Sequence, residues 1–490
     1  MKGYKFFIFV LIILLILYVL YQLQGYLAYR VLLPPNTTVA GLDVSLLTED
    51  EAKGLVEEAF GSPILLNYGA ETLKLSPRRV EFHLTQNAIG AEIARQRADN
   101  SFLRGFAGYL LGDEPPPMDI SVEIRFNEQK LEQVLLDAAQ EYDRGMLPPK
   151  VNYETLTFSY GQPAQRLDVE ASYPLVVDAL YSASGRVVDL VVEEGVSPPA
   201  PDIALLEELL SWRISEFPGI IGIFAKNMEN GDEVVFHGDV AYAGMSILKI
   251  PILIETYRYL DHEPGEETTK LLRETMIQSG NFTANLLLRQ LGYIQAGEDS
   301  AFAGVEILNG TLKKLGFVNT FMATPYDTKE LPRQIVTPAN SRTDLTTYPD
   351  PYMQITPFEA GLLMEMIYQL SQGGGTLMVA FPDQFTAQEG EDMIGLMAQN
   401  HEAILLEGGL PEDVTLAHKH GYVADTHADV AIVLTPDGAD FVLVVFIYAN
   451  TEWLGDRSLP IFSDVATITY NYFNINSQYI RPDLNVEEQE

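Results

Sequence analysis

The sequence predicts a mixed fold in three parts: one transmembrane helix, a smaller α+β domain and a larger α/β domain. Three observations lead to this prediction. An unbroken apolar run occupies residues 6–21, short alternating strands and amphipathic helices fill residues 32–196, and long apolar helices begin near residue 205. These helices are followed by two β-rich runs, 429–435 and 441–448, which are joined at a Pro-Asp-Gly turn and therefore predict an antiparallel hairpin.

The first part is the apolar run near the N-terminus. Its 16 residues would form about 24 Å of helix, and residues 22–27 can complete a span of about 30 Å. Lys2 and Lys5 precede the run, which favours a cytoplasmic N-terminus over residues 1–5 and an extracytoplasmic bulk of the chain. No clear small-x-small cleavage site follows. We therefore expect a retained single-pass anchor in the cell membrane over residues 6–27, with a cleaved signal peptide as the alternative.

Composition bounds the partners of the chain. With 490 residues, 47% hydrophobic and 20% charged, the chain has room for two or three globular domains. Its 68 Asp+Glu outnumber 31 Lys+Arg, giving a formal net charge of −37, which excludes nucleic acid as an expected partner because no basic surface is available. Cysteine is absent, so neither a disulfide framework nor a thiolate metal site can form.

The second part, residues 32–196, reads as a separate α+β domain. A capping box at Thr48 and Glu51 predicts a helix start, and residues 63–75, interrupted at Gly69, predict a hairpin. Residues 120–126 alternate as one strand and precede a helix over 128–142. A Pro-rich linker over 197–204 then leads to the larger domain over 205–478, and an acidic tail over 479–490, with Glu487–Glu490 as a solvated end, closes the chain.

Three short motifs in the larger domain carry the chemistry: Ser-Ile-Leu-Lys at 246–249, Ser-Gly-Asn at 279–281 and Lys-His-Gly at 419–421. A serine hydroxyl needs a neighbouring base to become a nucleophile. Residues three apart share a helix face, so Lys249 can reach the Ser246 oxygen. Each motif arises by chance or as a turn when taken alone, but their order and their apolar flanks indicate an acyl-transferring serine hydrolase.

The other motif residues suit the remaining tasks of acyl transfer. Ser279 could relay the proton to the leaving group, and Asn281 could hold a substrate amide. Lys419 adds positive charge for a substrate carboxylate, and Gly421 lets a substrate backbone lie against the strand.

On these motifs, residues 205–478 resemble the class A β-lactamase and penicillin-binding-protein superfamily, whose signature is Ser-x-x-Lys, Ser-Asp-Asn and Lys-Thr-Gly. The resemblance implies a β-lactamase/transpeptidase-like fold, an antiparallel sheet with a helical subdomain, and no cofactor. It also implies roles for site residues. The nucleophile would be Ser246, the base Lys249 and the proton relay Ser279, and the substrate-binding residues would be Asn281, Lys419, His420, Gly421 and Tyr422. The oxyanion hole would be the backbone N–H groups of Ser246 and Tyr422.

The chain departs from this signature in three places and lacks a recognisable deacylation base. Gly280 replaces the Asp, His420 replaces the Thr, and Pro251 removes a backbone donor early in the nucleophile's helix, where we expect a distorted turn. Family members that release the acyl group place Glu-x-x-x-Asn on a loop, and residues 321–357 contain no such pattern. Glu330, the one glutamate there, is the candidate base, with a solvated loop charge as the alternative. Slow release would favour penicillin binding over antibiotic destruction.

The earlier domain is similar to the domain of vancomycin-resistance W-type proteins to which peptidoglycan binding is ascribed. Residues 39–52 and 161–169 carry this similarity. The implied partner is peptidoglycan, and the alternative is a spacer that lifts the hydrolase away from the membrane.

The sequence thus predicts a membrane-anchored serine hydrolase that forms an acyl-enzyme on β-lactam or D-Ala-type amides. Two alternatives stay open: a DD-peptidase or penicillin-binding protein with slow deacylation, and a non-catalytic peptidoglycan-binding envelope protein. We also considered a zinc site at His418, His420 and His427. Their spacing matches no closed zinc pattern, so we predict no metal.

Overall fold

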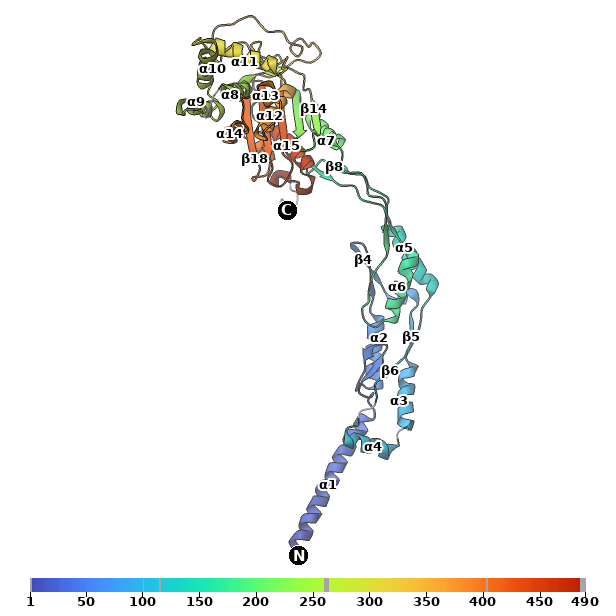
Figure 1. Cartoon of the computed structure of the whole chain (residues 1–490). Coiled ribbons are helices and arrows are strands. Elements are labelled where there is room, and N and C mark those ends of the chain that lie inside the picture. Colours follow the sequence, from blue (N-terminus) through green and yellow to red (C-terminus); the bar gives the residue numbers. More distant parts are fainter. Residues whose placement is uncertain (1, 100, 114–115, 260–263, 402–403, 485–490) are drawn as a thin grey trace. The chain divides into compact units, whose positions relative to one another are not determined.

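The computed structural model describes residues 2–99, 101–113, 116–259, 264–401 and 404–484. The chain forms two compact units (Figure 1). The first comprises residues 1–147 and 162–198, and the second comprises residues 148–161 and 199–490. The polypeptide therefore passes between the units three times.

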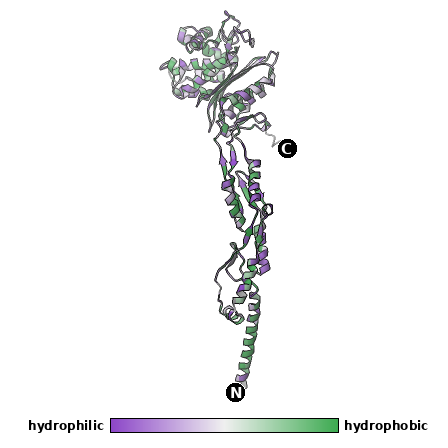
Figure 2. Ribbon diagram, turned by 90° about the vertical axis from the view of Figure 1, so that its right-hand side faces the viewer, coloured by the Kyte–Doolittle hydropathy of each residue, from purple (hydrophilic) through white to green (hydrophobic). Residues whose placement is uncertain are grey.

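The N-terminal helix α1 (Lys2–Tyr29) is almost uniformly apolar (Figure 2). Its segment Tyr4–Tyr29 is long and apolar enough to cross a membrane, and the side chains of that segment's most apolar window are not buried inside the protein. This composition is compatible with a membrane anchor or a signal sequence.

The rest of the first unit is built from short strands and five further helices of about three to four turns. The helices are α2 (Glu49–Gly61), α3 (Asn87–Asp99), α4 (Phe102–Leu111), α5 (Glu128–Tyr142) and α6 (Val169–Tyr181), with a 3₁₀ turn η1 (Pro77–Val80). The strands are β1 (Thr37–Val39), β2 (Leu42–Asp43), β3 (Ile64–Tyr68), β4 (Glu71–Leu75), β5 (His83–Thr85), β6 (Met118–Ile120), β7 (Glu123–Arg125), β10 (Gln165–Leu167), β11 (Val187–Asp189) and β12 (Val192–Glu194).

Two separate cores hold this unit together. One lies under α5 and α6 against the sheet β11-β3-β4, and the other lies between α2, α3 and the sheet β2-β1-β6. The predicted capping box at Thr48, the hairpin β3–β4 and the helix α5 are confirmed. The single strand expected over 120–126 is wrong: it divides into β6, which pairs with β1, and β7, which pairs with β5.

The second unit combines a long antiparallel sheet with helices on both faces. Its helices are α7 (Ile203–Ser215), α8 (Lys249–Arg258), α9 (Glu266–Met276), α10 (Asn281–Ala296), α11 (Ala301–Lys314), α12 (Pro357–Ser371), α13 (Thr376–Ala380), α14 (Ala387–Met397) and α15 (Leu459–Phe473). Its 3₁₀ turns are η2 (Met245–Leu248), η3 (Glu407–Gly409), η4 (Gly455–Ser458), η5 (Ile475–Ser477) and η6 (Pro482–Leu484). Its strands are β8 (Lys150–Asn152), β9 (Thr157–Ser159), β13 (Ile220–Asn227), β14 (Glu233–Phe236), β15 (Tyr242–Ala243), β16 (Phe321–Met322), β17 (Met353–Ile355), β18 (Thr415–Tyr422), β19 (Thr426–Leu434) and β20 (Phe441–Tyr448).

The five-stranded sheet of this unit has the order β14-β13-β20-β19-β18, and all its neighbouring strands are antiparallel. One core packs α8, α10, α12 and α14 against one face, and the other packs α7 and α15 against the opposite face. Both faces are covered, so β20 is buried along its whole length. This arrangement confirms the predicted fold class, including the hairpin β19–β20, and leaves β18 at the sheet edge.

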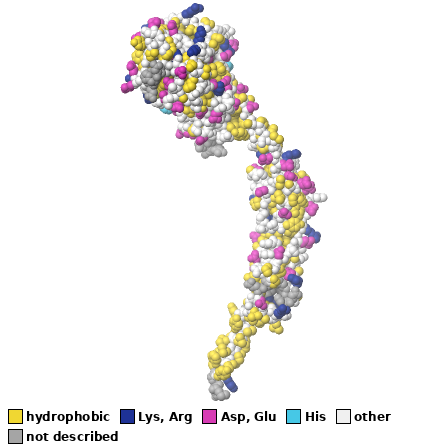
Figure 3. Space-filling view, viewed as in Figure 1, with side chains coloured by type: hydrophobic (Ala, Val, Ile, Leu, Met, Phe, Trp, Pro, Cys, Tyr) yellow, Lys and Arg dark blue, Asp and Glu magenta, His cyan; other side chains and the backbone are white. Residues whose placement is uncertain are grey.

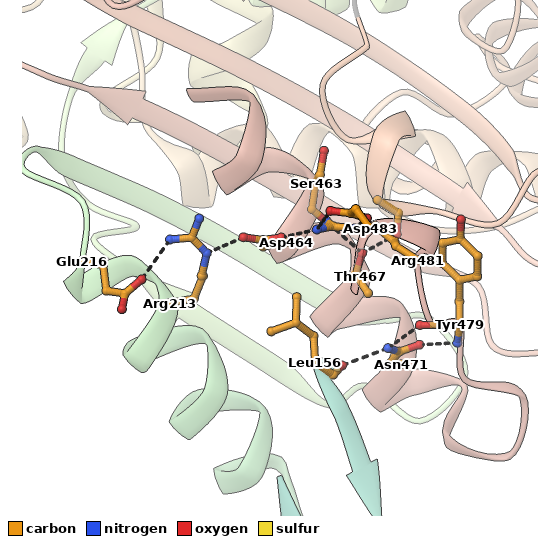
Figure 4. Close-up of polar contacts among 11 residues, drawn as sticks. Leu156, Arg213, Glu216, Ser463, Asp464, Thr467, Asn471, Tyr479, Arg481 and Asp483 are labelled. Carbon is orange, nitrogen blue, oxygen red and sulfur yellow. Dashed lines mark hydrogen bonds and ion pairs between the residues drawn. The ribbon is translucent and has the colours of Figure 1, made fainter. Parts of the chain in front are cut away.

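The hairpin β8–β9 is part of the second unit although it lies within the span expected for the earlier domain. Both backbone groups of Phe158 are hydrogen-bonded by the Gln478 side chain, at 2.6 and 2.7 Å. Asn471 on α15 donates to the Leu156 carbonyl at 2.9 Å (Figure 4). The Phe158 ring also meets the Tyr472 ring edge-on, with centroids 5.3 Å apart. The hairpin therefore completes the apolar face around α15.

The segment after α15 also packs onto this unit. Arg481 is 6% exposed and donates to Asp464, which in turn bonds Arg213 on α7 (Figure 4). Residues 479–484 are therefore structured, whereas the predicted solvated end Glu487–Glu490 lies outside the described residues.

Replacing Phe158 with alanine is expected to destabilise the second unit by about 3–5 kcal/mol, because it removes a buried aromatic ring and leaves a cavity beside Tyr472. Urea unfolding of the full chain, followed by far-UV circular dichroism, measures the change. The control is Tyr160→Ala on the same hairpin, where the side chain is 49% exposed. An equal effect of the two substitutions would contradict the role given to the Phe158 ring.

Candidate functional site

Ser246 lies in the 3₁₀ turn η2, immediately before α8. Its Oγ accepts a hydrogen bond from Lys249 Nζ at 2.8 Å. The preceding residue, Met245, has φ of 47°, a left-handed conformation that costs free energy for a residue with a side chain. Pro251 lies in the first turn of α8, where backbone N–H groups lack helical partners, so it breaks no helical hydrogen bond.

Lys249 is fully buried. Besides Ser246, its Nζ donates to Asn281 Oδ1 at 2.8 Å and lies 4.4 Å from the centroid of the Tyr326 ring. The Tyr326 hydroxyl donates to the Met245 carbonyl at 3.0 Å, and burial, together with the charge of Asp327, raises the pKa of this phenol. Tyr326 therefore stays neutral and closes one side of the lysine's pocket.

Helix α10 attaches the loop after β16 to the site. Asn281 donates from Nδ2 to Asp327 Oδ2 at 3.1 Å. One turn later, Asn285 bonds both the N–H and the carbonyl of Tyr326, each at 2.9 Å. These contacts place Asp327, Asn281, Lys249 and Ser246 in one hydrogen-bonded chain. Sequence reasoning missed Tyr326 and Asp327; the available signal was the i, i+4 spacing of the two asparagines.

Edge strand β18 lies against the turn that carries Ser246. A Cβ on Gly421 would lie 2.9 Å from Met245 Cβ and 3.1 Å from the Ser246 nitrogen, so only glycine allows this approach. Lys419, two residues earlier, is fully buried and donates to the His420 carbonyl at 3.0 Å. Tyr422 is 64% exposed.

Within β18, the buried His418 forms an ion pair with Asp429 of the neighbouring strand β19. His418 binds Asp429 through Nδ1 at 2.8 Å and the Asn400 carbonyl through Nε2 at 2.9 Å. Burial opposes its charge, but the charge and hydrogen bond of Asp429 outweigh that opposition and raise the pKa of His418. The Asn400 carbonyl can only accept and the Asp429 carboxylate is the counter-charge, so the imidazolium form fits both contacts.

His420, unlike the protonated His418, is a neutral imidazole. It is 2% exposed, and its ring stacks on Tyr422 with a 6° interplanar angle. Burial, then the positive charge of Lys419, lower the pKa of His420 to about 4. His420 is thus a neutral imidazole near neutral pH and lies beneath the surface that a substrate would touch.

This difference predicts acid sensitivity. Because the pKa of His420 falls from 6.5 when unfolded to about 4 when folded, stability is lost as pH falls through this window, by about 3 kcal/mol in all. The substitution His420→Asn, which removes the titrating group, is expected to reduce the loss by that amount. Urea unfolding at pH 7 and pH 4 tests this. The pKa of His427 is also lowered, chiefly by burial. Because His427 is present in both proteins, it contributes equally to both pH profiles. Parallel pH profiles would contradict the prediction.

A cavity of about 440 Å³ opens over Ser246. The residues that line it come from η2, α10, β18 and the loop between β16 and β17: Ala243, Met245, Ser246, Asn281, Thr324, Pro325, Tyr326, Asp327, Thr328, Leu331, Tyr348, Asp350, Tyr352, Met353, Tyr422, Val423, Asp425 and Thr426. Met245, Asp327 and Tyr348 all have positive φ, and such strained residues concentrate at functional sites. The cavity has room for a small ligand next to the Ser246 hydroxyl.

The structure brings together only some of the residues singled out from the sequence. Ser246, Asn281 and Tyr422 line the cavity, with Lys249 and Gly421 directly behind Ser246. Ser279 lies in the turn before α10 with φ of 56°, and it is not part of the cavity lining. Glu330 is exposed and is not part of the cavity lining.

Gly280, which stands where the signature has Asp, leaves little room for a side chain. A Cβ there would lie 2.5 Å from Thr283 Oγ1 and 3.2 Å from the Glu274 carbonyl oxygen. An aspartate at this position would therefore require the Thr283 hydroxyl to move.

Comparisons with known proteins concern the second unit. Residues 264–473 match the model of the β-lactamase enzyme family, so this C-terminal region is β-lactamase-like. The matched residues begin after Ser246 and Lys249. A search of the curated proteins gave no match.

Solved structures share parts of this fold at low identity. A mutant of PBP-A, as an acyl-enzyme complex with penicillin G, is 18% identical with a TM-score of 0.43, over 56% of this chain and 98% of that chain. A β-lactamase from Desulfarculus baarsii is 17% identical with a TM-score of 0.43, over 56% of this chain and 98% of that chain. The reconstructed class A β-lactamase of the last common ancestor of Gram-negative bacteria is 17% identical with a TM-score of 0.41, over 55% of this chain and 99% of that chain.

Proposed function

We propose that the second unit is a serine hydrolase that forms an acyl-enzyme on β-lactam or D-Ala-type amides through Ser246. The observation that carries the proposal is the 2.8 Å contact between Ser246 Oγ and the buried Lys249 Nζ at the base of an open cavity. The β-lactamase family match of the C-terminal region supports the same chemistry.

The proposed reaction begins with Lys249 in its neutral form. Ser246 Oγ attacks the amide carbonyl as its proton passes to Lys249 Nζ, and the backbone N–H groups of Ser246 and Tyr422 hold the developing oxyanion. The carbon–nitrogen bond then breaks, and the leaving nitrogen takes the proton back from Lys249, directly or through Ser279. The second Nδ2 hydrogen of Asn281 remains available for a substrate carbonyl, because one hydrogen is used by Asp327.

Release of the acyl group needs a base for water, and Asp327 suits this role better than Glu330. Asp327 lines the cavity and is connected through Asn281 to Lys249. Glu330 is exposed outside the cavity lining. An aspartate side chain is one methylene shorter than glutamate, which would leave more room for the water and a weaker hold on it.

Replacing Asp327 with asparagine is expected to slow deacylation by about 10²–10⁴-fold, because a positioned general base contributes that much. Intact mass after a single-turnover chase measures the decay of the adduct. Two control substitutions should leave the decay rate unchanged: Glu330→Gln, and Asp350→Asn on the cavity rim. An unchanged decay rate in Asp327→Asn would refute its role as the base.

We further propose that α1 anchors the chain in a cell membrane with residues 1–5 cytoplasmic and the bulk outside. Its length, apolar surface and exposed side chains support this placement (Figure 2). The first unit would then stand next to the membrane, where peptidoglycan is the expected partner of an envelope domain.

The test uses the full chain in detergent with a reporter penicillin. Intact mass followed over time is expected to show one adduct, and proteolytic mapping should place it on the peptide that contains Ser246. A long-lived adduct would favour a penicillin-binding protein, and turnover of D-Ala-D-Ala peptides would identify a DD-peptidase. If no adduct forms with either substrate class, the hydrolase proposal fails and the non-catalytic peptidoglycan-binding alternative takes its place.

A further inference from the structure

Helix α4 of the first unit exposes an apolar face that its own fold leaves uncovered. Leu103 is 78% exposed, Leu111 is 79% exposed and Leu110 is 44% exposed. Leu103, Ala107 and Leu110 follow one another at helical spacing, so they lie on one face. Arg104 is the only charged residue of the helix, which contains no acid although the chain as a whole is strongly acidic.

Helix α4 is fixed to the C-terminal end of α1 by interlocking aromatic side chains. The Tyr26 ring lies 5.4–5.6 Å from the rings of Phe102, Phe106 and Tyr109, centroid to centroid. Tyr26 is 4% exposed as a result.

Two glycines make this close packing possible. A Cβ on Gly105 of α4 would lie 2.1 Å from the Tyr26 hydroxyl, and one on Gly25 of α1 would lie 2.9 Å from the Tyr109 hydroxyl. On each helix, a glycine therefore packs against a tyrosine of the other helix. These two contacts fix the position of α4 along α1.

That position coincides with the depth at which α1 would leave a bilayer. From Phe6 to Tyr26 the helix rises about 30 Å, which is the thickness of the hydrocarbon core. Tyrosine and arginine are enriched at this boundary. Arg30 lies there, with its guanidinium 5.4 Å from the Phe102 ring centroid and 5.8 Å from that of Tyr26.

We propose that α4 is an interfacial helix, which lies in the headgroup layer of the membrane with Leu103, Leu110 and Leu111 in contact with acyl chains. This inference rests on the proposed anchor role of α1. The exposed apolar side chains of α1 and α4 then form one continuous lipid-contacting surface; Figure 3 shows hydrophobic side chains gathered along α1. The first unit would thereby be held at two places against the membrane and could not rotate freely about the end of α1.

The absence of cysteine allows the contact to be measured directly. Single variants Leu103→Cys and Leu111→Cys are labelled with an environment-sensitive fluorophore, and the full chain is reconstituted into phosphatidylcholine–phosphatidylglycerol vesicles that contain nitroxide-labelled lipid. Leu14→Cys, within α1, reports on the anchor. Val196→Cys, 86% exposed in the same unit, matches the exposure of the α4 sites without any predicted lipid contact.

We expect the nitroxide lipid to quench the labels at 103 and 111 several times more strongly than the label at 196. Quenching at 14 with none at 103 or 111 would overturn the interfacial helix and leave the anchor intact. No quenching at 14 would refute the anchor, and the interfacial placement with it.

A second variant series separates lipid contact from local packing. In the chain labelled at Leu110→Cys, adding Leu103→Asp and Leu111→Asp is expected to reduce the quenching at 110, while the label at 14 is unaffected. Both substituted side chains are exposed, so we expect the unit to fold normally. Undiminished quenching at 110 would contradict a contact made through these leucines.

Discussion

Replacing Ser246 with alanine is expected to abolish the covalent adduct with a penicillin, lowering the acylation rate by about 10⁶-fold, as is typical when the nucleophile of a serine hydrolase is removed. The Ser246 hydroxyl lines the cavity and accepts a hydrogen bond from the buried Lys249 Nζ at 2.8 Å. Folding should be preserved, because the change removes one side-chain hydrogen bond from a residue at the cavity surface.

The measurement is intact mass after incubation with excess penicillin. Ser300→Ala is the matched control: Ser300 lies at the start of α11 and makes no side-chain capping bond there. Full labelling of Ser300→Ala with none of Ser246→Ala would support the assignment. Undiminished labelling of Ser246→Ala would show that the nucleophile lies elsewhere and would refute the proposed mechanism.

Replacing Lys249 with methionine is expected to slow acylation by about 10²–10⁴-fold, the contribution of a general base. Methionine keeps much of the side-chain volume, and removing a fully buried amine should not destabilise the fold strongly. The Ser246 hydroxyl would remain but would have no base at 2.8 Å to take its proton. Stopped-flow measurement with a chromogenic penicillin gives the rate.

Lys226→Met provides the comparison, since Lys226 is partly buried and pairs with Glu365 at 2.9 Å, away from the cavity. Its acylation rate should equal that of the parent chain. If Lys249→Met acylates as fast as Lys226→Met, then Lys249 has only a structural role and another group must take the proton.

The site could be predicted from the sequence where it depends on short spacings. Ser246 and Lys249 meet because three residues fix their separation, and the capping box at Thr48 and the hairpin β3–β4 follow from equally local patterns. Asp327 could not be found this way. It reaches the cavity because Asn281 and Asn285, more than 40 residues earlier in the chain, hold its loop, and neighbouring glutamate Glu330 looks the stronger candidate in sequence.

Two other structural features could not be predicted from the sequence, because they also depend on contacts with other parts of the chain. The sequence of β8–β9 does not indicate to which domain the hairpin belongs. Its partners lie on α15 and in the segment after it, about 315–320 residues away in the chain. The strand expected over 120–126 has the right alternation, but two different neighbouring strands compete for its backbone and divide it. Alternation predicts an extended conformation; it does not choose the partner.

The docking of β8–β9 has a consequence for how the protein is made. Phe158 and Gln478, which hold each other through two hydrogen bonds, are 320 residues apart in the chain. At typical synthesis rates of about 5–20 residues per second, the hairpin waits for roughly 16–64 seconds before its partner emerges. During that interval Phe158 is an exposed aromatic on an unpaired two-stranded ribbon. The newly synthesised chain therefore exposes an apolar segment for a time that is set by the length of chain between Phe158 and Gln478.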